Sequence, residues 1–365
     1  MTSARPGGRV PFLRALGGEA KERIMRLPEP IYLGDRPLGP PVFLAPMAGI
    51  TDLPFRRMVA RFGAGLMVSE MVASSEMVTP RPSTRAAVRA KATVGAGLPV
   101  SVQIAGREAG AMAETARIVQ GMGAPIIDIN MGCPAKKVTG GLSGSALMRD
   151  LDHALRVVEA VVGAVEVPVT LKMRLGWDDS CLNAPELARR ASDAGVRMLT
   201  VHGRTRAQFY KGRADWAAIR AVSDLPGRPP LVANGDVTDA ASARAALAQS
   251  GAEAVMVGRG AQGAPWRLAA IAHRLWGTPA PERPLGAALA DLVEDHYRDM
   301  LSFYGTDLGL RVARKHLGWY ADANGAPLRA QMLRADSPDA TIALIRSAFT
   351  DAPGDDIAPA TGEAA

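Results

Sequence analysis

Cys133 stands in a position from which a cysteine could take part in catalysis. It follows an aliphatic stretch of the chain and lies in a turn framed by Gly132 and Pro134. A thiol with the ordinary pKa of about 8.5 is mostly protonated at neutral pH, so it could donate a proton as a general acid. The alternative is an inert, buried cysteine, since free cysteines are often buried. The residue type alone leaves both interpretations open.

Two further polar residues lie inside apolar stretches. Lys172 falls within TLKMRL, where its ammonium could stabilise negative charge on a bound cofactor, or form a buried salt bridge. Gln103 falls within VSVQIAG, where its amide could bind a planar heteroaromatic ring, or be a satisfied core amide. No His or Cys residues have the spacing of metal ligands, and His202 has no nearby serine or carboxylate. We therefore expect neither a metal centre nor a hydrolytic triad.

Eight short aliphatic stretches must position these residues, and a helical pattern follows each of them. The stretches are Val42–Pro46, Leu66–Glu70, Pro99–Gly106, Ile126–Gly132, Pro168–Met173, Met198–Gly203, Pro230–Gly235 and Ala254–Gly260. Continuous apolar runs are typical of strands buried on both faces. Eight strand–helix units over about 235 residues predict an α/β fold, the (β/α)8 TIM barrel. The alternative is a doubly wound open sheet, but Ala45–Gly49 is not the glycine-rich fingerprint that follows the first strand of that fold.

The helical patterns have apolar residues at helical spacing and often begin at a capping residue or end at a glycine. They are Asp52–Phe62, Glu108–Met122, Ser145–Val165, Pro185–Ala194, Asp215–Ser223, Asp239–Gln249 and Trp266–Leu275. We expect Ser75–Ala92 to become helical only toward its end, because Pro80 and Pro82 interrupt its start.

Polar or glycine residues stand at the end of all eight predicted strands. In a TIM barrel these ends meet at one mouth, where the active site lies. The loops after the last two strands often bind phosphate there. Gly258 and Gly260 would let the backbone approach a ligand closely, and Arg259 adds a permanent charge, although the glycines could also serve only tight turns. The sequence favours a phosphate site at this place.

The pattern changes after about Pro284, where helices follow one another without strands. The expected helices are Leu285–Tyr304, Asp307–Ala321 and Pro338–Phe349. We predict four regions in the chain. They are an N-terminal extension at 1–30, expected to be flexible, a catalytic barrel at 31–278, a helical domain at 279–350 and a disordered acidic tail at 351–365.

The composition excludes several classes of protein. Two cysteines cannot form the disulfide framework of a small secreted scaffold. No apolar run approaches the roughly 18 residues that span a bilayer, and the Arg-rich first 30 residues lack the apolar region of a signal peptide. We expect a soluble, monomeric protein of the cytoplasm.

The net charge of +7 has two interpretations, a solubility charge or a surface for a polyanion. Its placement favours the second. Seven basic and two acidic residues lie between Arg197 and Arg228, which is a local charge of +5, and Lys136 and Lys137 follow Cys133 closely. The tail hides part of the excess, because removing its four acidic residues from the total of +7 leaves +11.

Seven segments of the chain resemble the tRNA-dihydrouridine synthases, flavin-dependent enzymes that reduce uridine in tRNA. The GCPAKKV and HGRTR motifs are the most specific to this family. The longer segment GCPAKKVTGGLSGSALM is most similar to the bacterial B subgroup. The segments are LAPMAGITDLPFR (Leu44–Arg56), VQIAG (Val102–Gly106), DINMGCPAKKV (Asp128–Val138), LKMRLGWDD (Leu171–Asp179), TVHGRTRAQFYKGRADW (Thr200–Trp216), ANGDV (Ala233–Val237) and VGRGAQGAPW (Val257–Trp266).

The resemblance implies FMN as cofactor, NADPH as reductant and tRNA as substrate, and it gives roles to residues of the matched segments. Cys133 would be the catalytic proton donor. The implied cofactor-binding residues are Pro46, Met47, Ala48, Gln103, Lys172, His202, Asn234, Gly235, Asp236, Gly258 and Arg259. From their place at the mouth and their charge, we expect substrate contacts from Asn130, Lys136, Lys137, Arg174, Arg204 and Arg206, and we expect the helical domain to bind tRNA.

The implied reaction begins with reduction of FMN by NADPH. A uridine flipped out of its stack then takes a hydride at C6 and a proton from Cys133 at C5. Two other functions stay open. One is a flavin-dependent barrel enzyme that acts on a free pyrimidine, and this function needs neither the local charge of +5 nor the C-terminal helices. The other is a non-catalytic RNA-binding or regulatory barrel.

Overall fold

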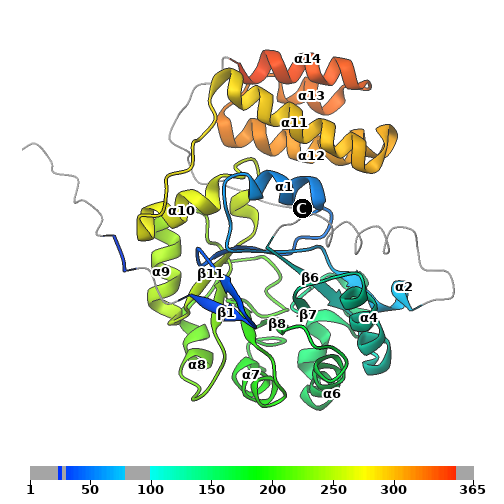
Figure 1. Ribbon diagram of the computed structural model, residues 1–365, viewed down its shortest axis with the longest axis vertical. Helices are drawn as coiled ribbons and strands as arrows, with labels where there is room; N and C mark the ends of the chain where they lie inside the picture. Colours follow the sequence, from blue (N-terminus) through cyan, green and yellow to red (C-terminus); the bar gives the residue numbers. More distant parts are fainter. Residues whose placement is uncertain (1–23, 27–29, 79–98, 351–365) are drawn as a thin grey trace, which may run out of the picture.

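The computed structural model describes residues 24–26, 30–78 and 99–350. Most of the N-terminal extension, the predicted helix leading to Ala92 and the acidic tail lie outside these described residues. Figure 1 shows the described chain as a barrel with a layer of C-terminal helices along one side of it.

Eight parallel strands form a closed barrel, so the predicted fold is confirmed. They are β3 (Val42–Leu44), β4 (Leu66–Val68), β6 (Val100–Ala105), β7 (Ile127–Met131), β8 (Val169–Arg174), β9 (Met198–His202), β10 (Leu231–Asn234) and β11 (Ala254–Val257). Neighbouring strands pair in this order, and β11 pairs with β3 to close the ring, while the two-residue β5 (Val72–Ala73) extends beside β6. Every residue of the eight strands is buried, which explains their continuous apolar pattern.

The helices around the barrel agree with the predicted patterns at most places, but the start of Ser75–Ala92, which was predicted not to be helical, lies in the short helix Ser74–Met77. They are α1 (Leu53–Ala60), α2 (Ser74–Met77), α4 (Ala109–Gly121), α6 (Leu151–Val162), α7 (Ala184–Asp193), α8 (Arg220–Ser223), α9 (Ala240–Ser250) and α10 (Arg267–Trp276), with short 3₁₀ turns η2 (Ala217–Ile219) and η3 (Arg259–Ala261). Side-chain caps explain the starts of α1 and α9. Asp52 accepts a hydrogen bond from the Phe55 amide at 2.9 Å, and Asp239 and Ser242 form a capping box.

One long helix predicted over Ser145–Val165 is two elements in the structure. A 3₁₀ turn, η1 (Gly144–Arg149), comes first, and α6 begins after Asp150. Asp150 is extended and its carboxylate accepts a hydrogen bond from the His153 amide at 3.0 Å, so it starts a new helix rather than continuing the turn.

A hairpin that the sequence analysis missed covers the N-terminal end of the barrel. Its antiparallel strands are β1 (Ile31–Leu33) and β2 (Arg36–Leu38). The apolar side chains of the hairpin join one buried cluster with residues at the beginnings of barrel strands, such as Phe43, Met198 and Ala254. The other end of the barrel, where the strands finish, is the mouth that carries the predicted site.

In the described part of the chain, four C-terminal helices follow the barrel, one more than predicted. They are α11 (Gly286–Tyr304), α12 (Thr306–Asn324), α13 (Arg329–Arg334) and α14 (Pro338–Phe349). They share a core of their own, which includes Val293, Leu317 and Phe349 and reaches Met58 of α1 and Trp266 before α10. In Figure 1 these helices, yellow to red, lie against α1. None of the helices in the described part of the chain combines the length and apolarity that crossing a membrane requires.

Candidate active site at the barrel mouth

The predicted site residues on the strands meet at the mouth of the barrel. Asn130 pairs in register with Lys172 on the neighbouring strand, and His202 pairs in register with both Arg174 and Asn234. The C-terminal ends of β7 to β10 therefore place these five side chains on two successive levels, with Asn130 and Lys172 on one and Arg174, His202 and Asn234 two residues nearer the strand ends.

The turn that carries Cys133 is held from two sides. The side-chain oxygen of Asn130 accepts hydrogen bonds from the amides of Gly132 (3.2 Å) and Cys133 (3.0 Å). From the other side, the Cys133 carbonyl accepts hydrogen bonds from the amide (3.1 Å) and the hydroxyl (2.9 Å) of Ser145. The thiol itself is free and half-buried. This arrangement fixes the backbone of the turn and keeps Cys133 close enough for its charge to act on Lys172.

A chain of hydrogen bonds connects this turn to the barrel interior. Asp128, on β7, accepts hydrogen bonds from Thr170 and from the Gln103 amide, both at 2.6 Å. The Gln103 oxygen then accepts a hydrogen bond from the Asn130 amide at 2.7 Å. Burial raises the pKa of Asp128, against the hydrogen bonds from Gln103 and Thr170. The chain orients both amides, and it leaves one N–H of Gln103 for a ligand. Asp128 had no predicted role.

Lys172 is a buried cation at the centre of the mouth. Its ammonium donates a hydrogen bond to the Asn234 side chain at 2.9 Å, and Asn234 in turn donates to the Met256 carbonyl at 2.9 Å. Burial, and next the charge of Arg174, lower the pKa of Lys172 to about 8, while Asp128 and Cys133 act in the opposite direction. An ammonium with a lowered pKa and two remaining N–H groups is suited to stabilise developing negative charge.

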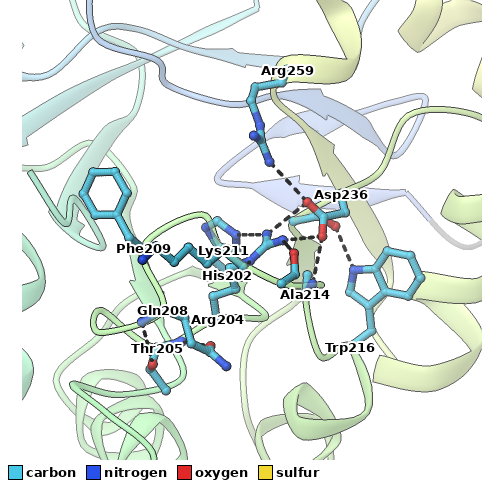
Figure 2. A network of polar contacts seen from close by, with 12 residues as sticks. His202, Arg204, Thr205, Gln208, Phe209, Lys211, Ala214, Trp216, Asp236 and Arg259 are labelled. Carbon is cyan, nitrogen blue, oxygen red and sulfur yellow. Dashed lines mark hydrogen bonds and ion pairs between the residues drawn. The ribbon is translucent and has the colours of Figure 1, made fainter. Parts of the chain in front are cut away.

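Asp236 joins two arginines beside Lys172. Figure 2 shows its carboxylate between them, bonded to Arg204 at 2.6 and 3.0 Å and to Arg259 at 3.3 Å. The Ala214 amide donates a further hydrogen bond at 2.8 Å. Burial acts to raise the pKa of Asp236, but the hydrogen bonds from Arg204 and Ala214 outweigh it and lower the pKa. The carboxylate is thus an anion that orients Arg259, whose side chain is 40% exposed.

His202 lies within this group as a neutral ring. Its Nε2 is 3.3 Å from the Arg204 guanidinium. Burial lowers its pKa well below the ordinary value, and so do the surrounding cations, which are Arg174, Lys172, Arg204 and Arg259. Gly235 leaves room for the ring, because a Cβ atom there would lie 2.8 Å from the His202 Cδ2. Gly235 also has a φ of +113°, which favours glycine.

Arg174 and Arg204, both predicted to contact substrate, are almost fully buried. Arg174 donates hydrogen bonds to the carbonyls of Gly132, Thr205 and Phe209, and Arg204 donates to those of Lys211 and Gly212. These contacts tie the loop after β9 to the Cys133 turn.

The other predicted substrate residues lie nearer the surface. The Arg206 guanidinium lies 4.8 Å from the ring centroid of Trp177. The exposed Lys136 and its neighbour Lys137 begin α5 (Lys136–Thr139), directly after the Cys133 turn.

The turn after β3 carries Pro46, Met47 and Ala48. Thr51 shapes it, because the Met47 amide donates to the Thr51 hydroxyl at 2.9 Å and the Met47 carbonyl accepts from the Thr51 amide at 3.0 Å. Gly258, of the predicted phosphate loop, is close by, since a Cβ atom there would lie 3.6 Å from the Met47 sulfur. Glu70, at the end of the second predicted strand, and Lys315, to which no sequence pattern pointed, both contact this turn through Gly49.

The basic residues between Arg197 and Arg228, which we expected to serve a polyanion together, are not all at the mouth. Arg197 and Arg228 precede β9 and β10, so they lie at the opposite end of the barrel, and Arg228 is paired with Glu253 at 2.9 Å. Arg220 donates hydrogen bonds to the carbonyls of Ala248 and Gln249 on α9. Four of the seven basic residues follow β9 at the mouth, namely Arg204, Arg206, Lys211 and Arg213. In the described residues no cluster of three or more His, Cys, Asp or Glu side chains could hold a metal ion.

Comparisons with known proteins identify the family that this chain resembles. Residues 43–352 match the sequence model of a family described as dihydrouridine synthase (Dus). A protein of Rhodobacter capsulatus named "Probable tRNA-dihydrouridine synthase" is 69% identical over 88% of this chain and 98% of its own length. Another of that name, from Rickettsia conorii, is 49% identical over 88% and 96%. The "tRNA-dihydrouridine synthase B" of Xanthomonas axonopodis pv. citri is 46% identical over 92% and 100%.

Proposed function

This chain belongs to the dihydrouridine synthase family, and we propose that it uses FMN and NADPH to reduce the C5–C6 double bond of uracil in specific uridines of tRNA. The observation that carries the proposal is a fixed cysteine turn beside a buried ammonium. Asn130 and Ser145 hold the backbone of Cys133, and Cys133 and Lys172 are close enough for their charges to interact.

The residues at the mouth fit an anionic, planar cofactor. The charges of Lys172, Arg174, Arg204 and Arg259 all act on His202, and the carboxylates among them are those of Asp128 and Asp236. A site with this excess of positive charge favours a phosphate and a reduced flavin, which both carry negative charge.

Particular residues would hold the two ends of FMN. Lys172 and the remaining N–H of Gln103 suit the ring system, with Asn234 orienting Lys172. The backbone of Gly258 and the half-exposed Arg259 suit the phosphate. We interpret Asp236 as the residue that positions Arg259, because a carboxylate would repel a phosphate in direct contact.

The reaction divides between cofactor and protein. When bound, FMN supplies a hydride for uracil C6 after NADPH has reduced it. Cys133 holds the proton that is transferred from its sulfur to C5, which leaves a thiolate. Lys172 and Arg174 attract that thiolate, and solvent returns the proton afterwards. The target uridine must leave its stack to reach this turn. We propose that Lys136 and Lys137 contact its phosphates and that the C-terminal helices bind the rest of the tRNA. We further propose that the reaction takes place in the cytoplasm.

Replacing Cys133 by Ala tests the proposal. We expect dihydrouridine formation in unmodified tRNA to fall by about 10²- to 10⁴-fold, the usual contribution of a general acid, while the flavin absorbance stays unchanged. Cys181→Ser is the matched control, because Cys181 is also a free, half-buried cysteine and has no predicted role. Normal turnover by the Cys133→Ala enzyme would exclude this role.

The same assay separates the two alternatives. Wild-type enzyme that reduces free uridine as well as tRNA would indicate a pyrimidine oxidoreductase. Purified protein without flavin absorbance that also gains none when FMN is added would indicate a non-catalytic barrel.

A further inference from the structure

The turn after β3 is held by both parts of the molecule through a single residue. The Gly49 amide donates a hydrogen bond to the Glu70 carboxylate, which follows β4 of the barrel. The Gly49 carbonyl accepts a hydrogen bond from the ammonium of Lys315, which lies on α12. Gly49 has a φ of +71°, and a Cβ atom there would lie 3.2 Å from the Lys315 nitrogen. The C-terminal helices therefore reach the edge of the mouth.

Lys315 belongs to a compact group of charges at this junction. Burial lowers its pKa, while the carboxylates of Asp52 and Glu70 act to raise it. Asp52 also accepts a hydrogen bond from the Tyr304 hydroxyl of α11 at 2.8 Å, and Arg56 donates to the Thr51 carbonyl. Two carboxylates on the barrel side thus attract Lys315 toward Gly49, and its ammonium is directed inward.

This junction matters because the turn is the one assigned to the flavin. The bonds between Met47 and Thr51 shape the turn from within. The two bonds of Gly49 tie it to its surroundings, one to the barrel and one to α12. Loss of either would let the turn move relative to Gly258 across the site.

We propose that Lys315 is a positioning residue for the flavin site, so that the C-terminal helices complete this site in addition to any contact with RNA. The inference rests on the proposed function, since it requires FMN against the turn of Pro46, Met47 and Ala48. The competing role for a lysine of these helices is a phosphate contact with tRNA.

The two roles are separated by measuring FMN affinity in the absence of tRNA. We expect Lys315→Met to weaken FMN binding by about tenfold or more, because a charge-assisted hydrogen bond that orders the site is lost. We expect Lys315→Arg, which keeps the charge, to retain part of the FMN affinity that Lys315→Met loses. Arg314→Met is the matched control, because Arg314 is the exposed neighbour on α12 and its removal changes the net charge equally. Its FMN affinity should equal that of the wild type.

Titration of flavin-free protein with FMN, followed by flavin fluorescence, gives these affinities, and KM for tRNA is measured on the holoenzymes. Unchanged FMN affinity in Lys315→Met together with a raised KM for tRNA would overturn the proposal and assign Lys315 to RNA. Should Lys315→Met fail to fold, Tyr304→Phe loosens the same junction without removing a charge, and unchanged FMN affinity in it counts equally against the proposal. Wild-type protein that binds no FMN contradicts the proposed function itself.

Discussion

Asp236 shows how a single residue can serve a ligand that it does not touch. It has a φ of +52°, which is unusual for a residue other than glycine, and its carboxylate points at Arg204 and Arg259. Backbone strain of this kind is kept where the surroundings fix it, often at functional sites. The surroundings here are Arg204, with a side chain only 2% exposed, and the Ala214 amide.

We expect Asp236→Asn to lower both stability and FMN affinity. Breaking a buried ion pair at one partner costs about 3–5 kcal/mol of unfolding free energy, because the buried charge of Arg204 then keeps only neutral partners, the carbonyls of Lys211 and Gly212. Arg259 also loses its anchor, so FMN binds more weakly. Urea unfolding and FMN titration measure the two effects, with Asp224→Asn, an exposed carboxylate after α8, as the control. If FMN bound more tightly, Asp236 would be a direct and repulsive neighbour of the phosphate.

At the scale of elements, α1 joins the C-terminal helices through a cluster of rings. Phe55 of α1 lies 5.9 Å from His296 of α11 and 5.5 Å from His316 of α12, measured between ring centroids. His296 is within 3.1 Å of the Tyr320 hydroxyl. Burial lowers the pKa of His296 to about 3 and that of His316 well below its ordinary range. Both rings are therefore neutral in the folded protein near neutral pH.

These histidines predict a loss of stability in mild acid. In the unfolded chain they take up protons near pH 6.5, whereas the folded protein keeps them neutral, so each can remove up to about 1.4 kcal/mol per pH unit below that value. Asp52 acts oppositely, because burial raises its pKa to about 6 and the folded state binds its proton more readily. We expect the free energy of unfolding to fall from pH 7 to pH 5 with a smaller slope in His296→Phe, as measured by urea unfolding at several pH values. An unchanged slope would mean that His296 takes up protons equally in the folded and the unfolded states.

Elements buried on both faces were the ones that could be predicted from the sequence. All eight barrel strands were found because their apolar runs are continuous, and the site residues were found because they end those runs. The hairpin of β1 and β2 was not predicted, because strands of three residues are too short to show a clear alternation of apolar and polar residues, and β2 also contains Pro37. The partners of the site residues could not be predicted either. Lys315 is 266 residues from Gly49 along the sequence, and no local sequence pattern predicts a contact between them.

In the molecule as a whole, the position of each charged residue matters more than the net charge of a segment. The seven basic residues between Arg197 and Arg228 are divided between the two ends of the barrel, and the charge of Arg204 is offset by Asp236. Lys211 and Arg213 remain exposed in the loop after β9, on the same side as Cys133. A polyanion that docks at the mouth would meet these cations first.

Because these basic residues lie at both ends of the barrel, reversing one charge at each end gives two variants that can be compared directly. We expect Arg213→Glu to weaken tRNA binding and to lower the slope of log Kd against log salt by about one, the effect of losing one phosphate contact. Arg197→Glu makes the same change of charge at the far end of the barrel, and both quantities should stay near the wild-type values. Equal losses in the two variants would point to a diffuse attraction and not to docking at the mouth. Fluorescence anisotropy over a series of salt concentrations gives both quantities.

The hairpin that covers the N-terminal end of the barrel has a practical consequence for anyone who shortens this protein. Ile31, Leu33 and Leu38 bury Phe43, Met198 and Ala254 from water at the closed end. A fragment that starts at the first barrel strand would keep every residue of the mouth and still expose this apolar floor. Such a fragment would be prone to stick to its copies, so an expression boundary belongs ahead of Ile31.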